Sequence, residues 1–386
     1  MPSYRRDRLT RFLFVCLVAF GVPIAALGPA VPSLRADLGI SLTVAGFHFT
    51  ALALGSVVIG LIGSRVVGRI GRTRVLQLGL AGLVLGPLGL VFGWSAPWTI
   101  ASTFGFGLGA NLVFLVVNGA LSDHHGEARS TALAEANVVT GVAFMVPGLL
   151  IGGLLSAGAS WRLVFAVPVV LSLLLLRPAS KRVLPVAAPS EDDEGGRFLP
   201  GFRAAVAALT LSVAIEWSIA GWAAEHLVGV GTPGAVAAVG ATIFYAAVTA
   251  GRAAVVPLTR RFTDGTLLAV AVGLTAFGAL TFWLGSTTGW VLAGIVVSGL
   301  GISSHFPLLA SVMFAKAPGR TDTAGARINL VGGLAVVVAP VTLGAWADAS
   351  GLRVALSGVV LLVVVLAAVL WIALRAEKAP AGRLRT

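Results

Sequence analysis

The 386-residue sequence has few charged side chains and almost no cysteine. Asp, Glu, Lys and Arg make up 11% of the residues, whereas soluble domains contain about 25%. The single cysteine, Cys16, excludes a disulfide framework and a cysteine metal cluster. This composition excludes a soluble enzyme, a nucleic-acid-binding domain and a disordered tail protein.

The sequence consists largely of long apolar runs. Hydrophobic residues account for 57% of the chain, and the mean hydropathy is +0.98. A bilayer core is spanned by a helix of about 20 apolar residues. We predict an all-α membrane protein with twelve transmembrane helices over residues 12–32, 43–64, 75–94, 97–121, 131–156, 161–176, 202–228, 235–257, 266–285, 289–314, 323–347 and 353–374.

The basic residues predict the orientation of these spans. With a cytoplasmic N-terminus, all but three of the 27 Lys and Arg fall on the inner side, the exceptions being Arg35, Arg162 and Arg353. The net charge of +12 is therefore interpreted as topology and lipid anchoring, not as a nucleic-acid footprint. Arginine outnumbers lysine, which is typical of a GC-rich bacterial genome. We expect a bacterial cytoplasmic (inner) membrane protein with both termini cytoplasmic.

An internal repeat divides the chain. Shifted by 192 residues, the segment Thr131–Asn137 falls on Thr323–Asn329, and Gly152 falls on Gly344. Arg69 falls on Arg261 in the same way. The repeat predicts two pseudo-symmetric six-helix halves, residues 1–176 and 202–386, joined by a cytoplasmic linker over 177–201.

Several short patterns resemble those of the major facilitator superfamily. They are the loop Gly68–Arg74, Val146-Pro147-Gly148 followed by Gly152-Gly153, Ser160–Phe165, Glu216-Trp217-Ser218, Gly251-Arg252, and Gly299 to Pro307. The N-terminal half is similar to drug and metabolite exporters, although Thr103 stands where drug–proton antiporters have arginine. The C-terminal half is similar to fucose permeases. The resemblance implies two parallel six-helix repeats and solute transport by alternating access.

Glu216 is the acidic residue that we place near mid-membrane. A carboxyl group at that depth is costly, which makes it a functional candidate, and a buried carboxyl can act as a proton carrier. We therefore assign proton coupling to Glu216. The alternative is a structural carboxylate held by arginine, tryptophan or serine.

Charged residues toward the cytoplasmic side are candidates for a gate. Glu135 and Arg327 occupy equivalent positions of the repeat, and Arg252 lies at a similar depth. We expect Glu135 to pair with Arg252 or Arg327 when the inner side closes. A permanent helix-packing pair is the alternative. Arg69 and Arg72 of the loop motif are assigned to the same conformational machinery.

Polar and aromatic residues at mid-depth are the candidates for binding substrate. They are Asn111, Phe114, Asn118, Trp217, Trp222, Tyr245, His305 and Phe306. Residues 111, 114 and 118 share one helical face, as a cavity lining requires. Core packing is the alternative at each of these positions.

The sequence as a whole indicates a proton-coupled secondary transporter of a small organic solute, with export slightly favoured. The alternatives are proton-driven uptake of a sugar-like solute and a non-transporting sensor or lipid scramblase. The sequence lacks a Gly-x-x-x-x-Gly-Lys-Ser/Thr loop, and its five histidines are scattered. We expect no enzymatic activity, cofactor, metal or nucleic-acid partner. The expected partners are the solute, protons and the bilayer, and the expected state is a monomer.

Overall fold

The computed structural model describes residues 5–181, 184, 198–318 and 320–378. These residues fold into helices and short connections, and no strand occurs among them. The first part of the chain forms α1 (Arg8–Leu38), α2 (Leu42–Val91), α3 (Ala96–His125), η1 (Gly126–Ala128), α4 (Arg129–Ser156), η2 (Trp161–Phe165) and α5 (Ala166–Ser180).

The second part begins after the expected linker. It forms α6 (Phe202–Gly229), α7 (Gly234–Ala237), α8 (Val239–Leu258), α9 (Asp264–Leu284), α10 (Thr288–Ile302), α11 (His305–Ala315), α12 (Thr321–Ser350) and α13 (Leu352–Lys378). Most of the linker expected over 177–201 lies outside the described residues, but α5 continues to Ser180, so helix extends into its first four positions.

Short polar residues start several of these helices. The Asp7 side chain accepts a hydrogen bond from the Thr10 amide at the start of α1, and Ser41 caps α2 in the same way. These contacts satisfy amide groups that have no partner inside the helix. Gly39 ends α1 with a positive φ of 62°, a conformation that glycine adopts without strain. The chain can therefore turn sharply from α1 into α2.

The 50-residue helix α2 consists of two arms that run in opposite directions, joined at Gly71, where φ is 78°. Along α2, Gly55 lies against Gly107 of α3, Gly63 against Leu115, Gly79 against Val113 and Gly86 against Phe106. The residue numbers of these α3 partners increase along the first arm and decrease along the second. The first arm is therefore parallel to α3, and the second is antiparallel to it. These arms correspond to the spans expected over 43–64 and 75–94.

Within the described ranges, ten helical stretches are long and apolar enough to cross a membrane. Two of them, Leu42–Val91 and Ala96–Ser156, contain 50 and 61 residues and are too long for one crossing of about 30 Å. The segment expected over 289–314 is interrupted between α10 and α11 at Ser303 and Ser304. The protein is an integral membrane protein.

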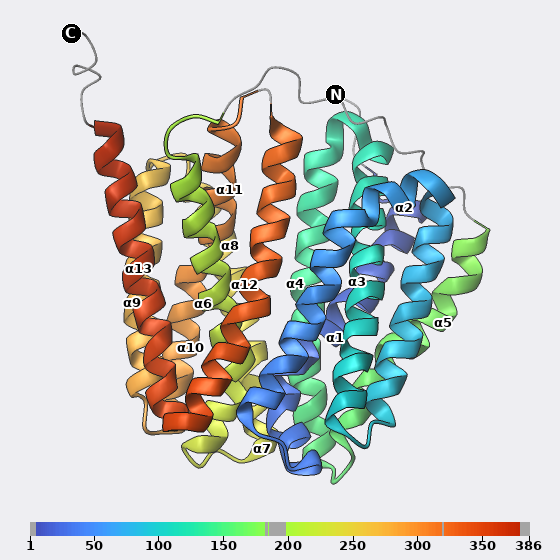
Figure 1. Ribbon diagram of the computed structural model, residues 1–386. Helices are drawn as coiled ribbons and strands as arrows, with labels where there is room; N and C mark the ends of the chain where they lie inside the picture. Colours follow the sequence, from blue (N-terminus) through green and yellow to red (C-terminus); the bar gives the residue numbers. More distant parts are fainter. Residues whose placement is uncertain (1–4, 182–183, 185–197, 319, 379–386) are drawn as a thin grey trace.

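The helices gather into two groups, α1–α5 and α6–α13, which are called here the N-terminal and C-terminal halves (Figure 1). The start of α1 and the end of α13 lie at the same end of the bundle, which is called the terminal end. The opposite end, where α1 leads into α2, is called the distal end. Helices α1 and α2 pack against α6 and α12, and α4 packs against α8, so these helices form the boundary between the halves.

Candidate substrate and proton site

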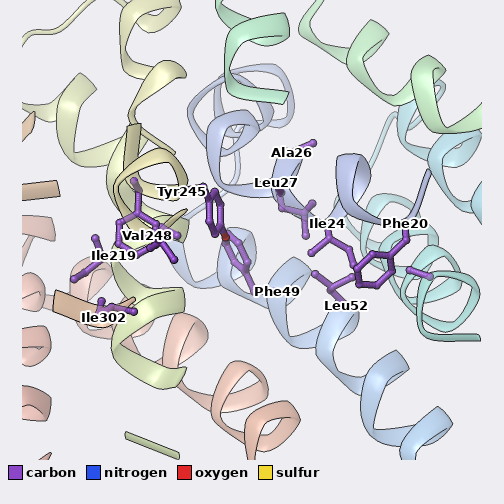
Figure 2. Close-up of a cluster of buried hydrophobic side chains, with 14 of the residues drawn as sticks. Phe20, Ile24, Ala26, Leu27, Phe49, Leu52, Ile219, Tyr245, Val248 and Ile302 are labelled. Carbon is purple, nitrogen blue, oxygen red and sulfur yellow. The ribbon is translucent and has the colours of Figure 1, made fainter. Parts of the chain in front are cut away.

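A small cavity lies on the boundary between the two halves. Its volume is about 10 Å³, which is room for about one water molecule. Figure 2 shows two of its lining residues, Phe49 from α2 and Tyr245 from α8, directed toward each other across this boundary. The full lining is Ile24, Ala25, Gly28, Phe49, Trp217, Ala220, Gly221, Ala241 and Tyr245. Two predicted substrate residues, Trp217 and Tyr245, therefore meet at one cavity.

Close backbone contact between α1 and α6 closes this cavity on one side. A methyl group added at Gly28 would lie 2.6 Å from the Ala220 carbonyl oxygen, and one added at Gly221 would lie 3.2 Å from the Phe49 ring. Any larger residue at Gly28 would push the two halves apart. The glycines therefore permit the close approach of the halves at the cavity.

Glu216 lies on α6 beside Trp217 and is half-buried. Its carboxylate interacts electrostatically with Arg252 of α8, and both charges also act on the Tyr245 hydroxyl. Among the described side chains, Glu216 and Arg252 do not form an ion pair within 4 Å. The structure thus groups Glu216, Trp217, Tyr245 and Arg252 near the cavity.

Aromatic rings connect this group to the predicted substrate residue Phe114. Phe114 stacks on Phe20 with ring centres 4.9 Å apart, and Phe20 faces Phe144 at 6.5 Å. Phe144 then meets Tyr245 edge-to-face at 5.1 Å. Phe114 is 37% exposed, so this aromatic row has one accessible end. The row crosses from α3, α1 and α4 of one half to α8 of the other.

Asn111, Asn118 and Trp222 are less exposed than Phe114. The amides of Asn111 and Asn118 each donate to a carbonyl oxygen of their own helix, at Gly107 and Phe114. Trp222 is fully buried against Phe49 of the other half.

The predicted site residues of α11 divide between the core and the surface. His305 is 1% exposed, and its Nε2 lies 3.3 Å from the Thr275 hydroxyl, so it is a core histidine in this conformation. Phe306 is exposed on α11.

The predicted gate residues have other partners in this conformation. Glu135 forms a two-point ion pair with Arg6, at 2.7 and 2.8 Å, and does not pair with Arg252 or Arg327. Arg327 instead lies over the rings of Phe198 and Phe202. The expected pairing thus remains a prediction for a conformation in which the terminal end is closed.

The two arginines of the loop motif differ in their surroundings. Arg72 pairs with Asp123 at 2.6 Å and lies against Gly119. Arg69 is exposed. The Arg72–Asp123 pair joins the bend of α2 to the end of α3, so it fixes the loop within the N-terminal half.

Charged and polar bonds at the distal end were not predicted from the sequence. Arg35 of α1 donates to the Glu225 carboxylate of α6, which joins the two halves. Asp348 of α12 accepts from the amides of Leu42 and Thr43, at 2.9 and 2.8 Å, at the start of α2. The sequence carries no signal for either contact, because the partners lie on helices far apart in the chain, and which helices are neighbours is visible only in the fold.

Two equivalent hydrogen bonds, with one donor in each copy of the internal repeat, also join the halves toward the distal end. The Thr50 hydroxyl of α2 donates to the Val337 carbonyl of α12 at 2.7 Å. The Thr242 hydroxyl of α8 donates to the Met145 carbonyl of α4 at 2.6 Å. Thr50 and Thr242 are 192 residues apart, and their acceptors Met145 and Val337 are also 192 residues apart. The same interaction therefore holds α2 against α12 and α8 against α4.

No group of three or more His, Cys, Asp or Glu side chains that could hold a metal ion occurs among the described residues. The polar groups that line the cavity are the Trp217 indole and the Tyr245 phenol, and the Glu216 carboxylate and the Arg252 guanidinium act electrostatically on Tyr245. They can exchange a proton, bind a charged or hydrogen-bonding group, and stack on a ring.

The sequence profile of the Major Facilitator Superfamily matches residues 13–318, which is more than half of the chain. The chain belongs to this superfamily. It is therefore an integral membrane protein of this family, with multiple membrane-spanning helices. The resemblance inferred from the loop motif, the span motifs and the repeat is confirmed.

Two relatives are uncharacterized MFS-type transporters of Mycobacterium tuberculosis, from two strains, CDC 1551 / Oshkosh and ATCC 25618 / H37Rv. Each is 29% identical to this chain over 307 residues, an alignment that covers 75% of this chain and 42% of the relative. The chain thus spans less than half the length of the curated relatives it matches.

Solved structures with the same fold include three transporters of low sequence identity. A nucleoside transporter, NupG, has a TM-score of 0.78 at 11% identity and covers 95% of this chain and 100% of its own. The xylose transporter XylE from E. coli, in a partially occluded inward-open conformation, has a TM-score of 0.74 at 13% identity, with 98% of both chains covered. An inward-facing bacterial homologue of the human lysosomal transporter Spinster has a TM-score of 0.71 at 16% identity, covering 97% of this chain and 98% of its own. These likenesses support the fold.

Proposed function

We propose that this protein moves a small organic solute across the bacterial cytoplasmic membrane by alternating access, coupled to protons through Glu216. Glu216 carries the proposal because it is an acid on the boundary helix α6 that interacts with Arg252 without forming an ion pair. A proton that binds Glu216 changes its attraction to Arg252, which lies on α8. Protonation is thereby linked to the relative position of two boundary helices.

The proposed topology has twelve spans and two cytoplasmic termini. Splitting α2 at Gly71 and the 61-residue stretch at η1 turns the ten apolar stretches into twelve. The excess of arginine on the terminal end favours the cytoplasmic side for that end. The halves 1–176 and 202–386 then each hold six spans.

The conformation is proposed to be inward-facing. The distal end carries the Arg35–Glu225 pair, the Asp348 bonds and the two threonine bonds, all of which join the halves. At the terminal end, the pairs Arg6–Glu135 and Arg72–Asp123 each remain within one half. Transport would require the distal bonds to break while contacts form at the terminal end.

The proposed solute contacts are the exposed ring of Phe114, the indole of Trp217 and the phenol of Tyr245. Rings with one or two polar tips favour an amphipathic or weakly polar solute. Export by antiport fits such a solute and remains slightly favoured. Uptake of a sugar-like solute is less well supported, because the Asn111 and Asn118 amide groups already donate within their own helix.

Proton flux in proteoliposomes tests the proposal. The purified protein is reconstituted with an internal pH-sensitive dye, and a panel of amphipathic amines, aromatic metabolites and monosaccharides is applied. We expect solute-dependent proton movement in the wild type and at least a tenfold loss in Glu216→Gln. Proton movement opposite to the solute identifies antiport, and movement with it identifies symport.

The matched control is Glu127→Gln, which removes an exposed acid in η1 and should retain wild-type flux. Solute movement without proton movement, equal in the wild type and Glu216→Gln, would contradict coupling through Glu216. If no solute accumulates while lipid moves or a ligand binds, the proposal that the protein is a transporter would be contradicted.

A further inference from the structure

A groove at the terminal end faces away from the cavity between the halves. It lies between α1 and α5 and has a volume of about 400 Å³. Its lining consists of Arg8, Arg11, Phe12, Val15 and Leu175. All but Leu175 belong to the first two turns of α1, so the groove lies where the first span begins.

The two arginines of this groove are accessible from outside the protein. Both are exposed, and among the described residues Arg11 donates to the backbone oxygen of Asp7, at 3.4 Å. The nearby Asp7 carboxylate is occupied by the Thr10 amide and hydroxyl and by His124, which lies at 2.7 Å. The groove therefore presents two guanidinium groups to an anion from outside.

The remainder of the groove is apolar and extends toward the membrane interior. Val15 lies seven residues beyond Arg8, which is a rise of about 10 Å along the helix. Phe12 and Leu175 form a buried floor, and Val15 is 41% exposed. The site thus combines a cationic rim with an apolar channel parallel to α1.

We propose that this groove binds one anionic phospholipid. The phosphodiester would bind Arg8 and Arg11, and an acyl chain would lie along Phe12, Val15 and Leu175. Guanidinium groups pair with phosphate oxygens, often through two parallel hydrogen bonds. A soluble anion would gain nothing from the apolar floor, and a zwitterionic lipid would bring a cation close to the arginines. Because transport does not enter this reasoning, the site is independent of the proposed function.

Native mass spectrometry of the full chain released from detergent tests the site. The protein is equilibrated with equal amounts of phosphatidylglycerol and phosphatidylcholine that carry the same acyl chains. A juxtamembrane cation contributes about 1 kcal/mol toward an anionic lipid, which is a preference of about fivefold for each arginine. We expect the wild type to retain one phosphatidylglycerol in clear excess, and Arg8→Gln/Arg11→Gln to retain both lipids equally.

Three variants serve as comparisons. Arg260→Gln/Arg261→Gln removes two exposed arginines near the end of α8 and should keep the wild-type preference. Arg8→Lys/Arg11→Lys keeps the charge and should keep most of the preference. Val15→Trp fills the apolar channel and should lower retention of both lipids, which a site for a soluble anion would not do.

Four outcomes of the lipid-retention measurements would overturn the proposal. They are equal retention of the two lipids by the wild type, an unchanged preference in Arg8→Gln/Arg11→Gln, an equal loss in the Arg260 and Arg261 control, and full retention in Val15→Trp. A dimeric species that disappears in Arg8→Gln/Arg11→Gln would also overturn it, because a second copy of the chain would then occupy the groove.

Discussion

Asp7 shows how a single side chain outside the spans contributes to stability. Burial alone would raise the pKa of this carboxyl, but hydrogen bonds from the Thr10 amide and hydroxyl and from His124 lower the pKa to about 2. Its folded pKa is thus below the unfolded value of about 3.9, so the stabilisation is present above pH 4 and is lost as the pH falls toward 2.

We expect Asp7→Ala to lower the free energy of unfolding by about 1 kcal/mol at pH 7, as loss of a helix cap does. The difference from the wild type should narrow as the pH falls from about 4 toward 2. Thermal unfolding in detergent measures it, with Asp7→Asn as the control because asparagine retains the cap without the charge. Equal effects of alanine and asparagine at every pH would contradict this role.

The Arg35–Glu225 pair is the charged bond between the halves at the distal end. Removing one partner leaves the other charge partly buried without its counterion. We expect Arg35→Glu and Glu225→Arg each to destabilise the protein by about 2 kcal/mol, and the double reversal to recover more than half of the lost Tm. A double variant no more stable than the weaker single variant would show that the pair contributes little.

Some residue-level features could be predicted from the sequence and others could not. Glu216 was identified because an acid in an apolar run is conspicuous, and Trp217 and Tyr245 because they are amphipathic residues at mid-depth. The Glu135–Arg6 pair was not identified, since the sequence does not show which helices are neighbours. Trp222 is fully buried in this conformation, and sequence depth alone does not distinguish a packed indole from an accessible one.

At the scale of elements, the two threonine bonds are equivalent parts of the repeat. The sequence contains the repeat and the pair of glycines Gly152 and Gly344, which lie at helix crossings in the structure. A methyl group added to them would lie 2.6 Å from the Ala235 carbonyl oxygen and 2.5 Å from the Leu42 carbonyl oxygen. The hydrogen bonds themselves could not be predicted, because their acceptors are backbone carbonyls, which every residue has.

We expect Thr50→Val and Thr242→Val to have similar effects, since each removes one hydrogen bond between helices of different halves. Each should cost about 1 kcal/mol of stability, and the double variant about the sum, because the two sites are in different helix pairs. Thermal unfolding measures this, with Thr281→Val as the control, because that hydroxyl donates within its own helix. A large effect at one threonine only would contradict the equivalence of the two crossings.

At the scale of the whole molecule, the apolar runs predicted the helices well and their ends less well. Each expected span overlaps a helix or a pair of consecutive helices of the described residues, because the membrane requires every backbone group to be bonded within a helix. The break at Ser303 and Ser304 was missed, since the run over 289–314 remains apolar through it. The arrangement of the halves follows from the repeat, whereas the state of closure depends on contacts between residues far apart in the chain.

Double electron–electron resonance can show whether the two ends of the protein open and close in alternation. Spin labels at Ala36 and Val228 report on the distal end, and labels at Ser130 and Arg260 report on the terminal end. All four positions are exposed, and the single native cysteine, Cys16, is buried. The distances are compared between the wild type, Gly344→Leu and Gly332→Leu. At Gly332 nothing lies within 4 Å of an added methyl group, which makes this variant the control.

In Gly344→Leu the new side chain should separate α12 from the start of α2. We predict a longer Ala36–Val228 distance together with a shorter Ser130–Arg260 distance, whereas Gly332→Leu should match the wild type. A distal end that opens while the terminal end stays unchanged would contradict alternating access.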